Sequence, residues 1–462
     1  MLRLRQLAAM IDGRALVLVV VFGGLFTLQS SNALDPAKVA YLLVAAAAVA
    51  VAMSMAPWWL SESRVEIARP WLISSAAFVG LLIVSLAVSR AHGTPATSWL
   101  RDAAPYALFA SAPILALACA RSVSRAWLIS VFAVCGSLAS LSFTVEWLGR
   151  RQLIDLPIDR IVLPAGTLAS GLLALATALA LAAAWRRSLW AAGGGAVLGL
   201  FFITGTRSTL ILLIIPVGLA LLAGRPWRPA ARALLIEAAV AVAVFLVAES
   251  TIAFANGTLP ILTPGQASPS SSAPDPFAQR VQGLGTLLTD PGSDQSFQER
   301  VTQTKVALQA FSSSPIVGVG PGYAFEWTDI GKQKLSSFTL DTPFLYLAKF
   351  GLLGLVPLGF FAAAYLRLIL KLRRTQPRAR VEFLAVAGFA LVLVASGILN
   401  VPMEDKGASF ALIFVVALGA RLLIHRDLTD TVSEPNLGEG EDMEATAAAG
   451  VGTTMGQLVS GR

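Results

Sequence analysis

The sequence predicts an all-α fold: a polytopic bundle of membrane-spanning helices with one large outer loop. Hydrophobic residues make up 56% of its 462 residues and charged residues 13%, and the mean hydropathy is +0.72. These values do not suit a soluble domain of this length. The apolar residues also occur in long runs, which is typical of helices that cross a bilayer.

Twelve apolar runs are long enough to cross about 30 Å of hydrocarbon, which takes roughly 17–25 helical residues. They lie near residues 15–31, 38–56, 70–88, 103–120, 126–145, 166–184, 188–204, 208–223, 233–250, 343–366, 383–399 and 408–424. The first run could be a signal peptide cut after SSNA, or an uncleaved anchor. The residues from Met1 to Arg14 and the continuous run after them favour the anchor.

Basic residues indicate the orientation of these spans, because Lys and Arg accumulate in short cytoplasmic loops. The connections on one side of the predicted topology are rich in arginine, whereas those on the other side hold fewer basic residues. Both termini are therefore expected in the cytoplasm. The formal net charge of +8 mostly reflects this bias, so we expect the lipid bilayer and no nucleic acid as a partner.

The predicted spans divide the chain into four parts. Residues 1–250 hold the first nine helices and residues 343–424 the last three. Between them lies a large periplasmic or extracellular loop at 251–342, too long for a simple connection. The final residues, 425–462, are acidic and are expected to form a disordered cytoplasmic tail.

The second half of the large loop carries a helical pattern. Ser296 with Glu299 three residues later is typical of a capping box. Apolar residues then recur at helical spacing, at Phe297, Val301, Leu308 and Phe311. We therefore expect a short amphipathic helix at 297–312, with its apolar stripe against the membrane or the bundle.

One arginine interrupts the long apolar run from Ser188 to Gly224. This run is too long for one span, so the chain is expected to reverse near Gly205, and Arg207 then lies at the outer membrane–water boundary. A snorkelling arginine could merely cap this hairpin. Arginine is costly near a span, however, so a ligand-binding role is an equal alternative.

Three segments, in this order, carry a family resemblance. They are TGTRST at the start of a span, ERVTQTKVALQAFSSSPIVGVGPGYAF in the large loop, and DTPFLYLAKFGLLGLV at the start of the next span. Together they resemble the O-antigen ligase and O-antigen polymerase superfamily, over about residues 190–400. These are integral membrane glycosyltransferases that act on undecaprenyl-diphosphate-linked glycans. The resemblance implies a multi-pass protein of the bacterial cytoplasmic (inner) membrane.

The resemblance also implies that Arg207 and Arg300 hold the diphosphate of the donor. Guanidinium groups fork onto phosphate oxygens and stay charged at any relevant pH, so the pair could bind the donor and stabilise its leaving group. We expect neither a metal nor a cofactor. The alternatives for Arg300 are a solvated helix face or an ion pair with Glu299, and Lys305 is either a further ligand or a solvated charge.

The chain departs from the family at the third segment. Ligases of the superfamily carry a histidine where this chain has Asp341-Thr342, and that histidine is taken to activate the acceptor hydroxyl. Asp341 could accept this proton, although aspartate is ordinarily a weak base. Alternatively, Asp341 caps the N-terminus of the tenth helix. His92, in a smaller outer loop, is a remote substitute.

Further arginines lie in the smaller outer loops. Substrate binding is expected of Arg101, Arg150, Arg151 and Arg160. The GVGPG sequence could present backbone N–H groups to a phosphate, but a turn after a helix is the simpler interpretation.

The absence of the family histidine favours a polymerase that joins lipid-linked repeat units of O-antigen, capsule or exopolysaccharide. The alternative is a ligase that transfers the glycan to lipid A core or another acceptor. Expected partners are the undecaprenyl-diphosphate-linked glycan, a glycan or lipid acceptor, a flippase and a chain-length regulator. Twelve helices also suit a polysaccharide or small-molecule transporter, but the two halves show no convincing similarity and the spans hold few charges.

Overall fold

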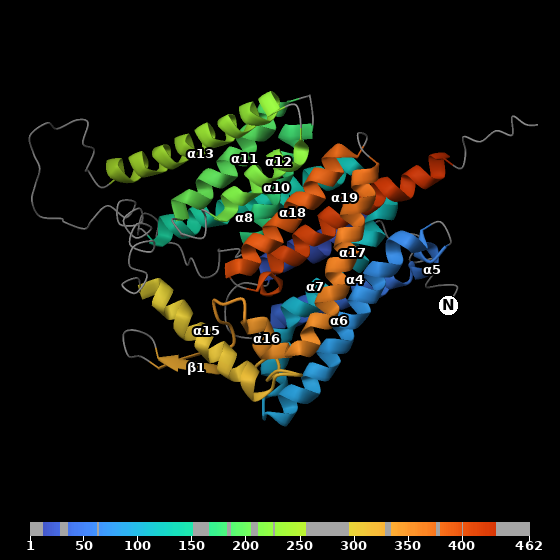
Figure 1. The fold of residues 1–462 in the computed structure, drawn as a ribbon, viewed down its shortest axis with the longest axis vertical. Coiled ribbons are helices and arrows are strands. Elements are labelled where there is room, and N and C mark those ends of the chain that lie inside the picture. Colours follow the sequence, from blue (N-terminus) through green and yellow to red (C-terminus); the bar gives the residue numbers. More distant parts are fainter. Residues whose placement is uncertain are drawn as a thin grey trace, which may run out of the picture. The chain divides into compact units, whose positions relative to one another are not determined.

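The computed structural model describes most of the helical chain (Figure 1). The described residues are 13–27, 36–61, 64–150, 166–182, 186–204, 211–224, 227–255, 295–328, 334–375, 379–399 and 401–430. The fold reported below belongs to the compact unit that ends at Ile424. The predicted disordered tail lies almost wholly outside the described residues.

Helices dominate the described chain, which confirms the predicted all-α membrane fold. In order they are α2 (Gly13–Val17), a π-helical turn (Leu18–Phe22), α3 (Gly23–Thr27), α4 (Pro36–Met53), α5 (Ala56–Trp59), α6 (Val65–Ala91), α7 (Ala96–Ser122), α8 (Arg125–Arg150), α10 (Gly166–Ala182), α11 (Arg187–Thr204), α12 (Ile214–Ala223), α13 (Trp227–Ala255), α15 (Gln295–Ser313), α16 (Leu345–Phe350), α17 (Leu355–Arg374), α18 (Arg380–Leu399) and α19 (Lys406–Asp430).

Eight helical segments of the described chain are long and apolar enough to cross a membrane. Four shorter apolar helical segments, at 13–27, 166–182, 187–203 and 211–223, lie where the remaining spans are predicted. The exact count of twelve therefore stays a prediction. The first segment packs within the bundle, since Val21 and Leu25 are fully buried and the hydroxyl of Tyr41 donates to the carbonyl of Val20 at 2.9 Å.

Three helices form the centre of the bundle. In the apolar segment of α7, 83% of the residues are buried, and in that of α19, 89% are buried. The corresponding share in α13 is 22%. Every residue of α10 from Thr167 to Leu181 is buried. Helices that are apolar on all sides are expected in such a position, because every face must contact another helix or lipid.

The predicted tenth span is wrong at its start. Instead of one helix at 343–366, the chain forms the short α16, a 3-10 turn at Leu352–Gly354 and then α17. The break lies at Gly351, whose φ of +60° is a left-handed conformation that favours glycine. The membrane-spanning candidate therefore begins at Leu352, and α16 belongs to the loop region.

The described part of the large loop contains α15 and a two-stranded hairpin. Helix α15 confirms the predicted amphipathic helix, although the side facing the core carries Val306, Ala307 and Ala310, while Leu308 is 40% exposed. Strands β1 (Phe325–Thr328) and β2 (Lys334–Ser337) pair antiparallel, and β1 packs against α15 (Figure 1). The hairpin was not predicted.

We call the region around these elements the loop end of the bundle. It comprises residues 92–102, which lead from α6 into the first turns of α7, residues 295–328 and 334–354, and residues 401–405 between α18 and α19. Direct hydrogen bonds join the second of these segments to the first, through Asp102, and to the third, through Glu404, as described below.

Candidate functional site

The amphipathic helix α15 is fixed against the segment that carries Asp341. The backbone N–H of Asp341 donates to Oε1 of Gln303 at 2.6 Å. One residue further along each segment, the hydroxyls of Thr304 and Thr342 lie 3.0 Å apart. Two adjacent polar contacts set the register of the helix against this segment, and Thr342 is fully buried beneath it.

Arg300 lies on the same face of α15 as these contacts. Residues 300, 303, 304 and 307 follow the i, i+3, i+4, i+7 spacing of one helical face. The side chain of Arg300 is half-buried and forms no salt bridge within the described part of the chain, so the alternative ion pair with Glu299 is not observed. A guanidinium group and the Asp341 segment are thus brought to neighbouring positions.

The capping role considered for Asp341 is not observed. Helix α16 begins after Phe344, which provides no side-chain cap. The backbone N–H of Phe344 instead reaches the hydroxyl of Thr342 at 3.4 Å. The side chain of Asp341 is exposed and makes no hydrogen bond to the described residues, which leaves its carboxylate accessible to a ligand.

Of the other predicted site residues, the structure describes the side chains of some and not of others. Arg207, Arg151 and Arg160 lie outside the described residues, as does the side chain of Arg150 at the end of α8. Lys305 is exposed on α15. The guanidinium carbon of Arg101 lies 4.6 Å from the ring centroid of Phe338, beside the hairpin.

The glycine-rich loop after α15 is a structural turn. The N–H groups of Val319 and Gly320 donate to the carbonyls of Ala348 and Lys349, each at 2.9 Å, and the N–H of Gly322 donates to Oδ2 of Asp102 at 2.6 Å. These donors are occupied by the protein itself. The interpretation of GVGPG as a phosphate cradle is therefore wrong for these groups, and the turn interpretation is confirmed.

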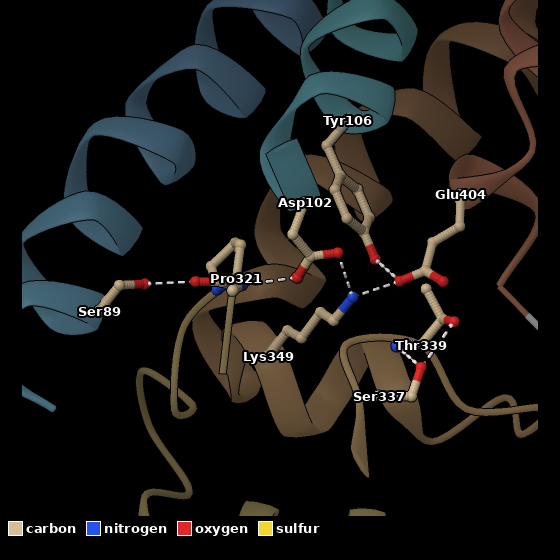
Figure 2. Close-up of polar contacts among 9 residues, drawn as sticks. Ser89, Asp102, Tyr106, Pro321, Ser337, Thr339, Lys349 and Glu404 are labelled. Carbon is tan, nitrogen blue, oxygen red and sulfur yellow. Dashed lines mark hydrogen bonds and ion pairs between the residues drawn. The ribbon is translucent and has the colours of Figure 1, made fainter. Parts of the chain in front are cut away.

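This loop covers a buried cluster of charged groups that the sequence analysis missed (Figure 2). Nζ of Lys349, fully buried in α16, contacts Oδ1 of Asp102 at 2.8 Å and Oε1 of Glu404 at 2.5 Å. The hydroxyl of Tyr106 donates to the same oxygen of Glu404 at 2.7 Å. The cluster joins α7, α16 and the turn before α19 at the loop end.

Burial and charge act against each other in this cluster. Burial disfavours the charged ammonium of Lys349, but Asp102 and Glu404 outweigh it and raise the pKa of Lys349 above its ordinary value. Burial raises the pKa of Glu404 despite the opposing effect of Lys349. One ammonium therefore balances two carboxylates, one of which also receives a tyrosine hydroxyl.

One signal in the sequence could have revealed this cluster. Lys349 lies within the apolar run that we predicted as the tenth span, and an ionisable residue in such a run calls for a partner. Its partners are far apart in sequence, since Lys349 is 247 residues from Asp102. Spacing along the chain could not have identified them.

The described residues contain no group of three or more His, Cys, Asp or Glu side chains arranged to hold a metal ion. The chemical groups available at the α15 face are thus a guanidinium, a carboxylate and neutral hydrogen-bonding side chains. Such a set suits the binding of an anion beside a hydroxyl-bearing acceptor.

Comparison with known proteins supports the family resemblance. Residues 192–359 match the family model described as O-antigen ligase, and this segment contains Arg207, Arg300 and Asp341. A search of curated proteins finds no match. Members of the matched family are glycosyltransferase-like enzymes that use lipid-linked glycans in a membrane. Residues 192–359 of this multi-pass membrane protein are thus similar to the O-antigen ligase family, which supports the resemblance to the O-antigen ligase and O-antigen polymerase superfamily.

Proposed function

We propose that the protein polymerises lipid-linked oligosaccharide repeat units on the outer face of the bacterial cytoplasmic membrane, without a metal ion. The donor is an undecaprenyl-diphosphate-linked glycan, and the acceptor is a second lipid-linked repeat unit. Both termini of the chain lie in the cytoplasm, which puts the loop end on the outer side. A flippase that delivers the donor and a regulator of chain length are its functional partners.

The observation that carries this proposal is the docking of α15 on the Asp341 segment. It supports a site in which Arg300 and Asp341 act on one substrate. Arg207 is added to this site on the family resemblance, and Arg101, Arg150, Arg151, Arg160 and Lys305 are proposed to contact the substrate around it.

The transfer breaks one bond and forms another. An acceptor hydroxyl attacks the anomeric carbon of the donor, and the bond from this carbon to the diphosphate oxygen breaks. The departing diphosphate gains negative charge, which Arg207 and Arg300 stabilise through charge-assisted hydrogen bonds. The hydroxyl proton passes to the carboxylate of Asp341. Because aspartate is a weak base, leaving-group stabilisation and positioning carry most of the rate enhancement.

A ligase is the second candidate, and the description of the matched family as O-antigen ligase favours it. The two candidates share the donor and differ in the acceptor. Deletion of the gene separates them: unextended lipid-linked repeat units accumulate if a polymerase is lost, and long unattached chains accumulate if a ligase is lost. Failure of repeat units to reach the outer face would instead indicate a transporter.

Complementation of the deletion strain tests the site. At matched protein levels, Arg207→Ala and Arg300→Ala should fail to restore the glycan, and Arg300→Lys should restore it partly because lysine keeps the charge but loses the planar fork. Lys334→Ala, on the exposed strand β2, is the matched control. Full restoration by both alanine variants would refute the proposed diphosphate site.

The role of Asp341 needs a separate pair of variants. Asp341→Asn keeps the shape of the side chain and removes its basicity, whereas Asp341→Ala removes both. If the carboxylate accepts the proton, both variants should lose activity by a similar factor. Full activity of the asparagine variant would show that another group, or water, receives the proton.

A further inference from the structure

A cavity of about 780 Å³ opens between the turn after α6, the C-terminal half of α15 and the β1–β2 hairpin. Its volume is within the range of about 300–1,000 Å³ typical of small-ligand sites. Three aromatic side chains line it, those of Tyr323, Phe325 and Phe338. Gln309, Glu326 and His92 line it as well, and all three are exposed to solvent.

This combination of side chains matches the chemistry of a sugar. A sugar ring has apolar C–H faces that pack on aromatic rings and hydroxyl groups that exchange hydrogen bonds with amide, carboxylate and imidazole groups. Neither lysine nor arginine is among the described residues that line the cavity, and Glu326 would repel an anion. A phosphate therefore fits poorly, and so does a lipid chain, which would leave the polar groups unpaired.

The aromatic wall is fixed in place. The rings of Tyr323 and Phe325 meet edge to face with centroids 5.2 Å apart, and Phe325 is 1% exposed. On the hairpin, the guanidinium of Arg101 covers one face of the Phe338 ring. The buried Phe325 thus supports Tyr323, and the half-buried rings of Tyr323 and Phe338 are the ones that a ligand can reach without a large loss of side-chain entropy. Arg101 thus contributes to the cavity by holding the ring of Phe338 in place.

His92 presents a defined nitrogen to the ligand. Its Nδ1 lies 3.0 Å from the carbonyl oxygen of Val88. A carbonyl can only accept, so Nδ1 must carry the hydrogen, and Nε2 of the neutral ring is then a hydrogen-bond acceptor. A sugar hydroxyl is a suitable donor to this nitrogen.

The cavity is separate from the proposed diphosphate site. Val306, Gln309, Ala310 and Ser313 line it from α15, and they follow a different helical face from Arg300, Gln303 and Thr304. Gln309 is nine residues beyond Arg300, which is about 13 Å along the helix axis. Helix α15 therefore carries Arg300 on one face, and a different face of the same helix, closer to its C-terminus, lines the cavity.

We infer that this cavity is a saccharide-binding subsite that holds sugars of a glycan at a distance from the carbon that reacts. The inference rests on the proposed function, because it assumes that the substrate is a glycan. It adds a recognition site that depends on sugars and is independent of the diphosphate. Either the donor or the acceptor glycan can supply these sugars.

Two adjacent serines on α15 provide a matched test. Ser313 lines the cavity, whereas Ser312 does not; both are exposed, and each hydroxyl bonds the carbonyl three residues earlier, at 2.7 and 2.8 Å. Ser313→Trp should fill the cavity, and Ser312→Trp should leave it open. The probe is the repeat-unit oligosaccharide of the host, released from its lipid diphosphate by mild acid and labelled with a fluorophore.

Binding is measured by fluorescence anisotropy with the full-length protein in lipid nanodiscs. The wild type and Ser312→Trp should bind the probe, and Ser313→Trp should bind it about tenfold more weakly or worse. Arg300→Ala should bind it like the wild type, since the probe lacks a diphosphate. Equal binding by the two tryptophan variants, or no binding by the wild type, would overturn the inference.

The same assay identifies which glycan occupies the subsite and keeps the two proposals apart. Unlabelled lipid-linked repeat units carry the same sugars and should compete with the probe in the wild type and in Arg300→Ala alike. Competition that needs much higher concentrations in Arg300→Ala than in the wild type would assign the sugars to the donor, and equal competition in both would assign them to the acceptor. If transfer requires Arg300 but Ser313→Trp still binds the probe, the cavity inference fails and the proposed function stands.

Discussion

Among single residues, Lys349 combines full burial with two ion pairs. Its ammonium is fully buried between the carboxylates of Asp102 and Glu404. Taking such charges out of water is costly, and close pairing offsets this cost. The cluster therefore specifies how α7, α16 and residues 401–405 meet.

Replacing this lysine should destabilise the protein strongly. Lys349→Met leaves two buried carboxylates without a cation, and the loss of one partner of a buried ion pair costs about 3–5 kcal/mol. Thermal unfolding of the purified protein in detergent measures the effect, with Lys334→Met as the exposed control. An unchanged unfolding temperature for Lys349→Met would show that the cluster is not formed.

At the scale of elements, the loop after α15 depends on glycines at positive φ. Gly318 has a φ of +71°, and a Cβ there would collide with the carbonyl group of Lys349. Gly93 has a similar φ of +75°, but a Cβ there would meet nothing within 4 Å. The two positions therefore separate backbone strain from close packing.

Alanine substitutions at these glycines should have different effects. Gly93→Ala pays only for the left-handed conformation, about 1–2 kcal/mol. Gly318→Ala should lose more, because the loop must also move away from α16. The free energies of unfolding of both variants, compared with the wild type, test this. A smaller loss for Gly318→Ala than for Gly93→Ala would contradict the packing of the loop on α16.

The docking of α15 can be tested by cross-linking. Because the hydroxyls of Thr304 and Thr342 lie 3.0 Å apart, cysteines at these positions should be close enough to form a disulfide. The matched control pairs Thr342→Cys with Lys305→Cys, one residue along α15 and exposed. Mobility on non-reducing gels after mild oxidation reports the bond. Rapid cross-linking of the control but not of the first pair would contradict the observed register.

Hydrophobic patterning predicted the elements better than their boundaries. The run length identified α17 and the spacing of apolar residues identified α15, because both signals are local. The break at Gly351 was missed because α16 is as apolar as a span, and only its hydrogen bonds with Val319 and Gly320 reveal that it belongs to the loop end. The β1–β2 hairpin was missed because FEWT and KLSS are too short for a clear alternating pattern.

At the scale of the whole molecule, a central set of helices supports a loop end built from distant segments. The loop end joins residues 102, 349 and 404 through the buried cluster, and it carries α15 and the hairpin. The sequence could indicate Arg300 and Asp341, since each lies in a segment typical of the family. It could not indicate Lys349 with its partners or the cavity, which exist only once the segments are packed.

The proposed function requires that Arg207 and Arg300 bind the diphosphate of the donor together. Its most direct test is the affinity of the protein in nanodiscs for undecaprenyl diphosphate, compared with undecaprenyl monophosphate. Loss of a charge-assisted hydrogen bond costs about 1.5–3 kcal/mol, so Arg207→Ala and Arg300→Ala should each weaken diphosphate binding by roughly 10- to 100-fold. Wild-type affinity in both variants would show that these two arginines do not bind the diphosphate.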